Sequence, residues 1–125
     1  MSISTSYRAT MFDGQPELDW LRLGWRALRL YGQKAKAAMQ AEDLGEKAEM
    51  ISRADHLLTV MTGIIDLADG SALGSALMRI YAALRVALLE ANISNRAEVL
   101  DDYDKALKSL DMEFATLSQA EGKKS

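Results

Sequence analysis

Apolar residues recur at alternating three- and four-residue intervals through four long stretches of this sequence, and no other feature constrains the fold as strongly. Positions three and four apart lie on one side of an α-helix, so each stretch predicts a helix with an apolar stripe. The only proline, Pro16, stands where the first turn of a helix tolerates it. No later proline interrupts helix formation. We therefore expect an all-α protein.

The spacing predicts four helices, at residues 16–42, 45–67, 71–94 and 96–119. The expected core stripes are Leu18, Leu21, Trp25, Leu28, Ala35 and Met39; Ile51, Ala54, Leu58, Met61 and Ile65; Leu73, Leu77, Ile80, Leu84, Leu88 and Ala91; and Leu100, Tyr103, Leu107, Leu110, Phe114 and Leu117. Turns are expected at Asp43 with Gly45, at Asp69-Gly70-Ser71, and from Asn92 to Asn95. Short connections join antiparallel neighbours, which predicts an up-down-up-down four-helix bundle over residues 16–120. A three-helix bundle with one peripheral helix is the alternative.

The length of 125 residues fits one domain. Residues 1–15 are expected to form a short flexible or loosely docked N-terminal arm, and residues 121–125 a disordered tail. The chain has no cysteine, no apparent signal peptide and no apolar run of about 18 residues, so we expect a cytoplasmic protein without membrane insertion.

The net charge of −3 disfavours a nucleic-acid binder. The nearest approach to a basic stripe lies in the first predicted helix, and we interpret it as a solvated helix face rather than a phosphate track. Its members are Arg22, Arg26, Arg29, Lys34 and Lys36.

Two of the predicted helices carry more apolar residues than one core face requires. Opposite its core stripe, the third helix has a second one, Met78, Ala82, Val86, Leu89 and Ile93. The first helix has a surplus of Trp20, Leu23, Ala27, Leu30 and Tyr31. A contiguous apolar strip exposed on a monomer usually marks an interaction surface. From periodicity alone, these residues could equally pack against the terminal arm, a homodimer partner or a less regular core.

The residues for catalysis or metal binding are missing from the sequence. A di-iron bundle needs Glu-x-x-His motifs, whereas Arg53 stands three residues before the single histidine, His56. Phosphotransfer domains are bundles of similar length with one exposed histidine. They resemble one another in a lysine three residues after that histidine, and Thr59 occupies that position here. We expect no enzyme activity, no cofactor and no metal, and keep phosphotransfer at His56 as an alternative.

The third predicted helix carries a recognisable segment, Ile80-Tyr81, Leu84 and Leu88-Leu89-Glu90-Ala91-Asn92. It resembles the hallmark of the FliS-type flagellin export chaperones, in which an aliphatic-tyrosine pair leads through a spaced aliphatic residue to Leu-x-x-Ala-Asn. The similarity runs without a gap from Ile64 to Phe114. It weakens in the first helix, where Arg26-Ala27 replaces the usual Asp-Gly pair.

The resemblance implies an export chaperone that binds the disordered C-terminal segment of flagellin, prevents its early polymerisation and delivers it to a component of the flagellar export gate. The surplus stripes are then the expected binding surface, with Tyr81 and Asn92 carried over from the family motif. The expected partner-binding residues are Trp20, Leu23, Leu30, Met78, Tyr81, Val86, Leu89, Asn92 and Ile93. Tyr81 could instead pack at the core edge, and Asn92 could cap its helix. A self-associating structural bundle, dimeric when unliganded, is the remaining alternative.

Overall fold

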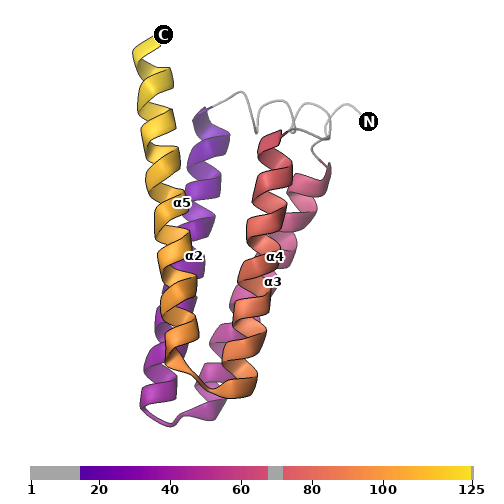
Figure 1. Ribbon diagram of the computed structural model, residues 1–125, viewed down its shortest axis with the longest axis vertical. Helices are drawn as coiled ribbons and strands as arrows, with labels where there is room; N and C mark the ends of the chain where they lie inside the picture. Colours follow the sequence, from indigo (N-terminus) through magenta and orange to yellow (C-terminus); the bar gives the residue numbers. More distant parts are fainter. Residues whose placement is uncertain (1–14, 68–71, 125) are drawn as a thin grey trace.

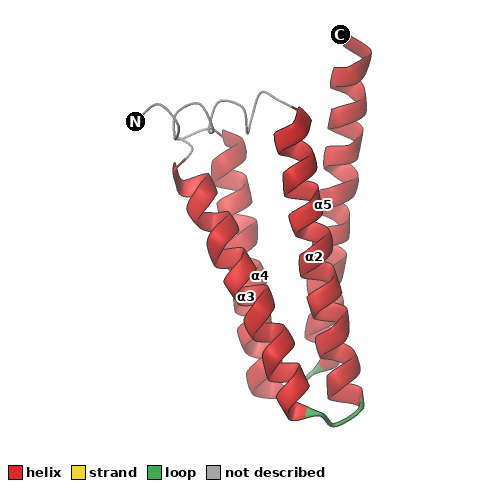
Figure 2. Ribbon diagram, turned by 180° about the vertical axis from the view of Figure 1, so that it is seen from behind, coloured by secondary structure: helices red, strands yellow, loops and turns green. Residues whose placement is uncertain are grey.

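The computed structural model describes residues 15–67 and 72–124. Each of these two ranges is helical except for one short connection within it, at residues 41–43 and 95–96 (Figures 1 and 2). The four helices are α2 Gln15–Gln40, α3 Leu44–Leu67, α4 Ala72–Ser94 and α5 Ala97–Lys124. The predicted arm and the predicted turn at 69–71 lie outside the described residues. α5 continues to Lys124, through the stretch expected to be a disordered tail. A single glycine there costs a helix only about 1 kcal/mol.

The helices form a four-helix bundle in which each packs against two others. α2 contacts α3 and α5, and α4 contacts the same two, so α2 and α4 lie diagonally across the bundle. Along α2, Arg22, Arg29 and Lys36 bond to Asp111, Asp104 and Asp101 of α5. Partner numbers that fall as α2 numbers rise require these helices to run antiparallel, as Figure 1 shows. The predicted all-α bundle is confirmed, and the three-helix alternative is wrong.

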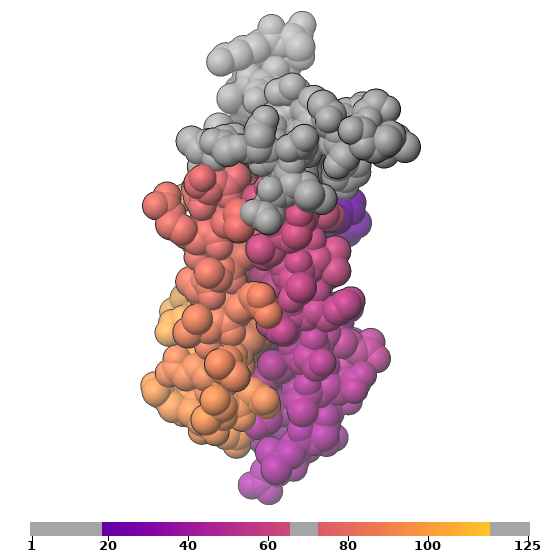
Figure 3. Space-filling view, turned by 90° about the vertical axis from the view of Figure 1, so that its right-hand side faces the viewer, coloured from indigo at the N-terminus to yellow at the C-terminus, as the bar shows by residue number. Residues whose placement is uncertain are grey.

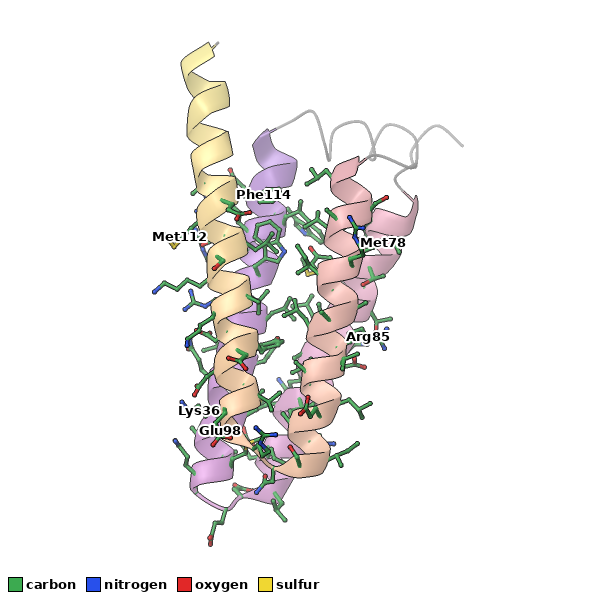
Figure 4. All side chains as sticks on the ribbon, in the orientation of Figure 1. Lys36, Met78, Arg85, Glu98, Met112 and Phe114 are labelled. Carbon is green, nitrogen blue, oxygen red and sulfur yellow. The ribbon has the colours of Figure 1, made fainter. Side chains whose placement is uncertain are left out.

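The bundle interior consists of the predicted stripes. The described stripe residues are buried except Leu73 and Ile80, which are half-buried against the core; the side chains of Leu18 and Leu117 lie outside the described part. Five further side chains are buried in the described part that the spacing did not assign to the core, namely Ala38, Lys47, Met50, Tyr81 and Val99. Figure 4 shows Phe114 pointing into the bundle, where its ring meets Trp25 edge-on at a centroid distance of 4.9 Å.

Two buried hydrogen bonds join helices through this core. Trp25 Nε1 donates to Tyr81 Oη at 2.8 Å and links the diagonal pair α2 and α4. Tyr103 Oη donates to the Leu28 carbonyl at 2.9 Å and links α5 to α2. Burial raises the pKa of both tyrosines, because a phenolate would lose its hydration there. The two hydroxyls therefore remain neutral donors and acceptors.

The connection between α2 and α3 satisfies the ends of both helices. Glu42 has φ 59°, and the amides of Glu42 and Asp43 bond back to Met39 and Ala38, which is a Schellman end to α2. Asp43 Oδ1 then accepts the Glu46 amide and caps α3. The predicted turn at Asp43 is confirmed. Gly45 lies inside the first turn of α3 rather than in the connection.

Three helical glycines in different surroundings give a matched stability test. Gly32→Ala should destabilise by about 1–3 kcal/mol, because its Cβ would lie 2.7 Å from the Tyr103 ring, which the bond to Leu28 holds in place. Gly24→Ala should be nearly neutral, since it meets the flexible end of Met61. Gly63→Ala meets nothing within 4 Å and should stabilise by up to about 1 kcal/mol. Urea unfolding measures all three, and equal effects at Gly32 and Gly63 would contradict the proposed close approach.

Candidate functional site

An apolar strip runs along the outer side of α4, opposite the side that faces the core. Val86 is 63% exposed, Leu89 59% and Ile93 77%, and Ala82 is exposed one turn earlier. Met78, at the start of the same line, is half-buried against the core. We call Ala82, Val86, Leu89 and Ile93 the α4 strip. It lies on the surface, which is the condition that the interpretation as an interaction surface requires.

The α4 strip borders a groove between α3 and α4 with a volume of about 540 Å³. Figure 3 looks onto the face that these two helices form. The lining residues are Ala48, Ile51, Ser52, Asp55, Ala82, Arg85, Val86, Leu88, Leu89 and Asn92. Arg85 Nε donates to Asp55 Oδ1 at 2.9 Å across the groove, so its main charges are already paired. The remaining surface suits an apolar helix face.

A second apolar strip lies on α2. Leu23 is 63% exposed and Leu30 48%, with the half-exposed Ala27 between them. We call these three residues the α2 strip. Trp20 and Tyr31, expected in the same surface, are half-buried against the core, so they contribute one edge rather than whole rings. Val60 of α3 is 42% exposed and lines a shallow pocket together with Tyr31.

The two strips are separate surfaces. Because α2 and α4 are diagonal, α3 stands between them on one side and α5 on the other. Apart from Val60, the exposed outer side of α3 is mostly polar or small; its members include Glu49, Ser52, His56, Thr59 and Gly63. The sequence could not reveal this separation, because periodicity describes each helix alone and not which helices are neighbours.

Tyr81 and Asn92, the residues carried over from the family motif, occupy different environments. Tyr81 is fully buried and accepts the bond from Trp25, so it is absent from both surface strips. Asn92 is exposed and lines the groove beside the α4 strip. It does not cap α4, because the helix ends at Asn95, which has φ 58°.

Sequence reasoning missed Lys47, which organises the end of this groove. Its side chain is buried, and Nζ donates to the Asn92 carbonyl and to Asn95 Oδ1, both at 3.2 Å. A cation at a helix C-terminus is favourable because the last carbonyls carry partial negative charge. The Asn92–Asn95 break marked this helix end in the sequence, but nothing marked the lysine from α3 that stabilises it.

The basic residues of the first helix mostly form ion pairs within the bundle. Arg22 bonds to Asp111 at 2.7 Å, Arg29 to Asp104 at 3.0 Å, and Lys36 to Asp101 at 2.6 Å. The hydrogen bond from Arg29 to Asp104 raises the pKa of its guanidinium further. The interpretation as a solvated face therefore needs correction for these three, because α5 supplies their counter-charges. Only Arg26 and Lys34 remain largely exposed.

The described residues hold no cluster of three or more histidine, cysteine, aspartate or glutamate side chains suited to a metal ion. His56 is exposed and lines the shallow pocket of Tyr31 and Val60, next to Arg53 and Glu49. None of the described helices is both long and apolar enough to cross a membrane.

A four-helix bundle with two apolar surface strips, one of them beside a groove whose Arg85 and Asp55 are paired, is the framework of a protein that binds other proteins through helix faces. Residues 15–121 match the sequence model of a family described as Flagellar protein FliS. The chain belongs to the FliS family and is a flagellar chaperone, as the resemblance of its third helix implied. A comparison with curated proteins found no match.

Proposed function

We propose that this chaperone binds the C-terminal segment of flagellin on the α4 strip and the α2 strip. In the cytoplasm it keeps the segment from polymerising and delivers it to a component of the flagellar export gate. The observation that carries the proposal is the α4 strip, three large aliphatic side chains left exposed beside a groove with paired charges. The proposed contact residues are Trp20, Leu23, Leu30, Met78, Val86, Leu89, Asn92 and Ile93; Tyr81 acts as a buried support.

The energetics favour use of both strips. Fully burying a valine, leucine or isoleucine side chain contributes about 1.5–3 kcal/mol. At their exposures, covering Val86, Leu89 and Ile93 therefore contributes about 3–6 kcal/mol. A disordered segment forfeits about 2–5 kcal/mol or more in ordering, so the α4 strip alone leaves little net affinity. Leu23 and Leu30 add about 2–3 kcal/mol and make binding favourable.

A segment that reaches both strips has to cross the outer side of either α3 or α5, and the path over α3 begins at the groove beside the α4 strip. A helix is about 10–12 Å wide with its side chains, so a path around it is roughly 20–30 Å long. Extended chain covers this with about six to nine residues. Two helical pieces of about four turns and one crossing together need about forty residues. The polar outer side of α3 suits an extended crossing piece whose backbone is hydrated.

The test is titration calorimetry with the last forty or so residues of the cognate flagellin. We expect a Kd of about 10 μM, a negative heat-capacity change and a gain of helical circular dichroism as the segment orders. A segment that does not bind at tens of micromolar contradicts the proposal. Light scattering in the same samples tests self-association: a dimer stable to the added segment would favour a structural bundle instead.

A further inference from the structure

The α2 strip has the spacing of a coiled-coil seam. Leu23, Leu30 and Ala37 are seven residues apart and all exposed, and the small Ala27 lies between the two leucines. Seven-residue spacing lets a second helix lie along the first, and small residues allow a close approach. In such pairs, the charges that flank the seam determine which partner binds. The charged residues in and beside the seam of α2 therefore indicate which kind of helix binds there.

The charges on this side of α2 are positive and incompletely neutralised: Arg26 lies beside the seam, and Lys34 lies in it, between Leu30 and Ala37. Arg26 is 57% exposed, and its Nε lies 3.8 Å from Asp111, whose other oxygen is 2.7 Å from Arg22. Two cations thus share one carboxylate. Lys34 is exposed, and no ion-pair partner for it occurs within 15–67 and 72–124. Among the described side chains on this side of α2, Asp19, near the start of the helix, carries the negative charge.

The α4 strip differs in charge. Its nearest cation in the groove, Arg85, is neutralised by Asp55 at 2.9 Å, and Arg79 lies nearly one turn before Ala82, outside the lining of the groove. The α4 strip therefore discriminates by shape and apolar contact, whereas the α2 strip also discriminates by charge. The protein as a whole is acidic, with a net charge of −3, so a basic flank on α2 runs against the average of the chain.

We propose that the α2 strip takes an acidic helix, with aspartate or glutamate in and beside its apolar seam, and that Arg26 and Lys34 determine this specificity. The inference rests on the proposed function, since the acidic helix is the part of the flagellin segment that reaches α2. The proposal therefore places the two helical pieces of the flagellin segment. The acidic piece lies on α2, and the piece selected by apolar contact lies in the groove between α3 and α4.

A protein helix fits this surface better than an anionic membrane does. Only Leu23 and Leu30 project as large apolar groups, while the aromatic rings of Trp20 and Tyr31 are half-buried. Most other cations of α2 are held by carboxylates of α5 and are not available to lipid headgroups. Interfacial membrane binding depends on a broad apolar face with many free cations.

The test uses two synthetic helices with the same leucine-alanine seam, one flanked by glutamate and the other by lysine. Fluorescence anisotropy should show the acidic helix binding at least tenfold tighter at low salt, with the difference shrinking as salt screens the charges. Arg26→Glu with Lys34→Glu should reverse the preference, and Lys34→Glu alone should reduce it without disturbing any ion pair. Arg79→Glu is the matched control, since it makes the same charge change on α4 and should leave the preference unchanged.

Equal binding of both helices, an unchanged preference in the double variant, or equal capture by phosphatidylserine vesicles would overturn the assignment. The flagellin segment separates the two proposals. If wild type binds the segment and the double variant binds it equally well, the charge assignment fails and the proposed function stands. If wild type does not bind the segment, the proposed function fails. If both proposals hold, the double variant should bind the flagellin segment about tenfold more weakly than wild type does.

Discussion

Replacing Val86 and Leu89 by aspartate is expected to weaken binding of the flagellin segment at least a hundredfold. Both side chains are about 60% exposed on α4 and border the groove. The change removes about 2–4 kcal/mol of apolar contact and adds the cost of desolvating two carboxylates. Since every 1.4 kcal/mol is tenfold in Kd, titration calorimetry should show binding reduced to the limit of detection.

The folded bundle itself should not be affected by this double change. The two side chains contribute little to the interior, and surface substitutions of this kind usually alter stability by less than about 0.5 kcal/mol each. Met112→Asp is the matched control, because Met112 is 61% exposed but lies on α5, outside both strips; Figure 4 shows it projecting from that helix. Normal binding by the double variant, or an equal loss in the control, would remove the α4 strip from the site.

Trp25→Ala is expected to have the largest effect on stability, about 3–5 kcal/mol. The change empties the centre of the core, removes the edge contact with Phe114 and leaves the buried Tyr81 hydroxyl without its donor. Urea unfolding followed by circular dichroism measures the loss. A cost below about 1.5 kcal/mol would indicate that the core collapses around the vacancy and that the diagonal link contributes little.

A double-mutant cycle separates the hydrogen bond from the packing. Trp25→Phe and Tyr81→Phe each leave one polar group buried and unpaired, at about 1–3 kcal/mol. The double variant removes both groups, so its cost should be smaller than the sum of the two single costs. Strictly additive costs would show that the 2.8 Å contact contributes no coupling.

The sequence predicted the helices and their core stripes well, because the three-and-four spacing is a property of each helix alone. It misplaced residues whose environment depends on a neighbouring helix. Tyr81 fits the four-and-three spacing between Leu77 and Leu84 better than the predicted Ile80 does, but the donor that satisfies its buried hydroxyl comes from Trp25 on the diagonal helix. Lys47 is buried because the end of α4 supplies two oxygen acceptors. Neither interaction leaves a local signal in the sequence.

The candidate site was predictable only in part, for the same reason. The exposed residues that the surplus apolar spacing indicated are Leu23, Leu30, Ala82, Val86, Leu89 and Ile93. The separation of the strips and the pairing of Asp55 with Arg85 depend on how α3 stands between α2 and α4. An isolated helical pattern does not specify which faces meet.

The ion pairs between α2 and α5 also restrict how far one helix can slide along the other. A displacement by one turn would bring Arg22 toward Lys108 in one direction and Arg29 toward Lys108 in the other, so either shift replaces an attraction by a repulsion. Alternative registers are penalised even though the apolar stripes alone would tolerate them. The positions of Leu23 and Leu30 along the bundle axis are therefore the same in every molecule. A client segment then meets the α2 strip and the α4 strip at a fixed separation.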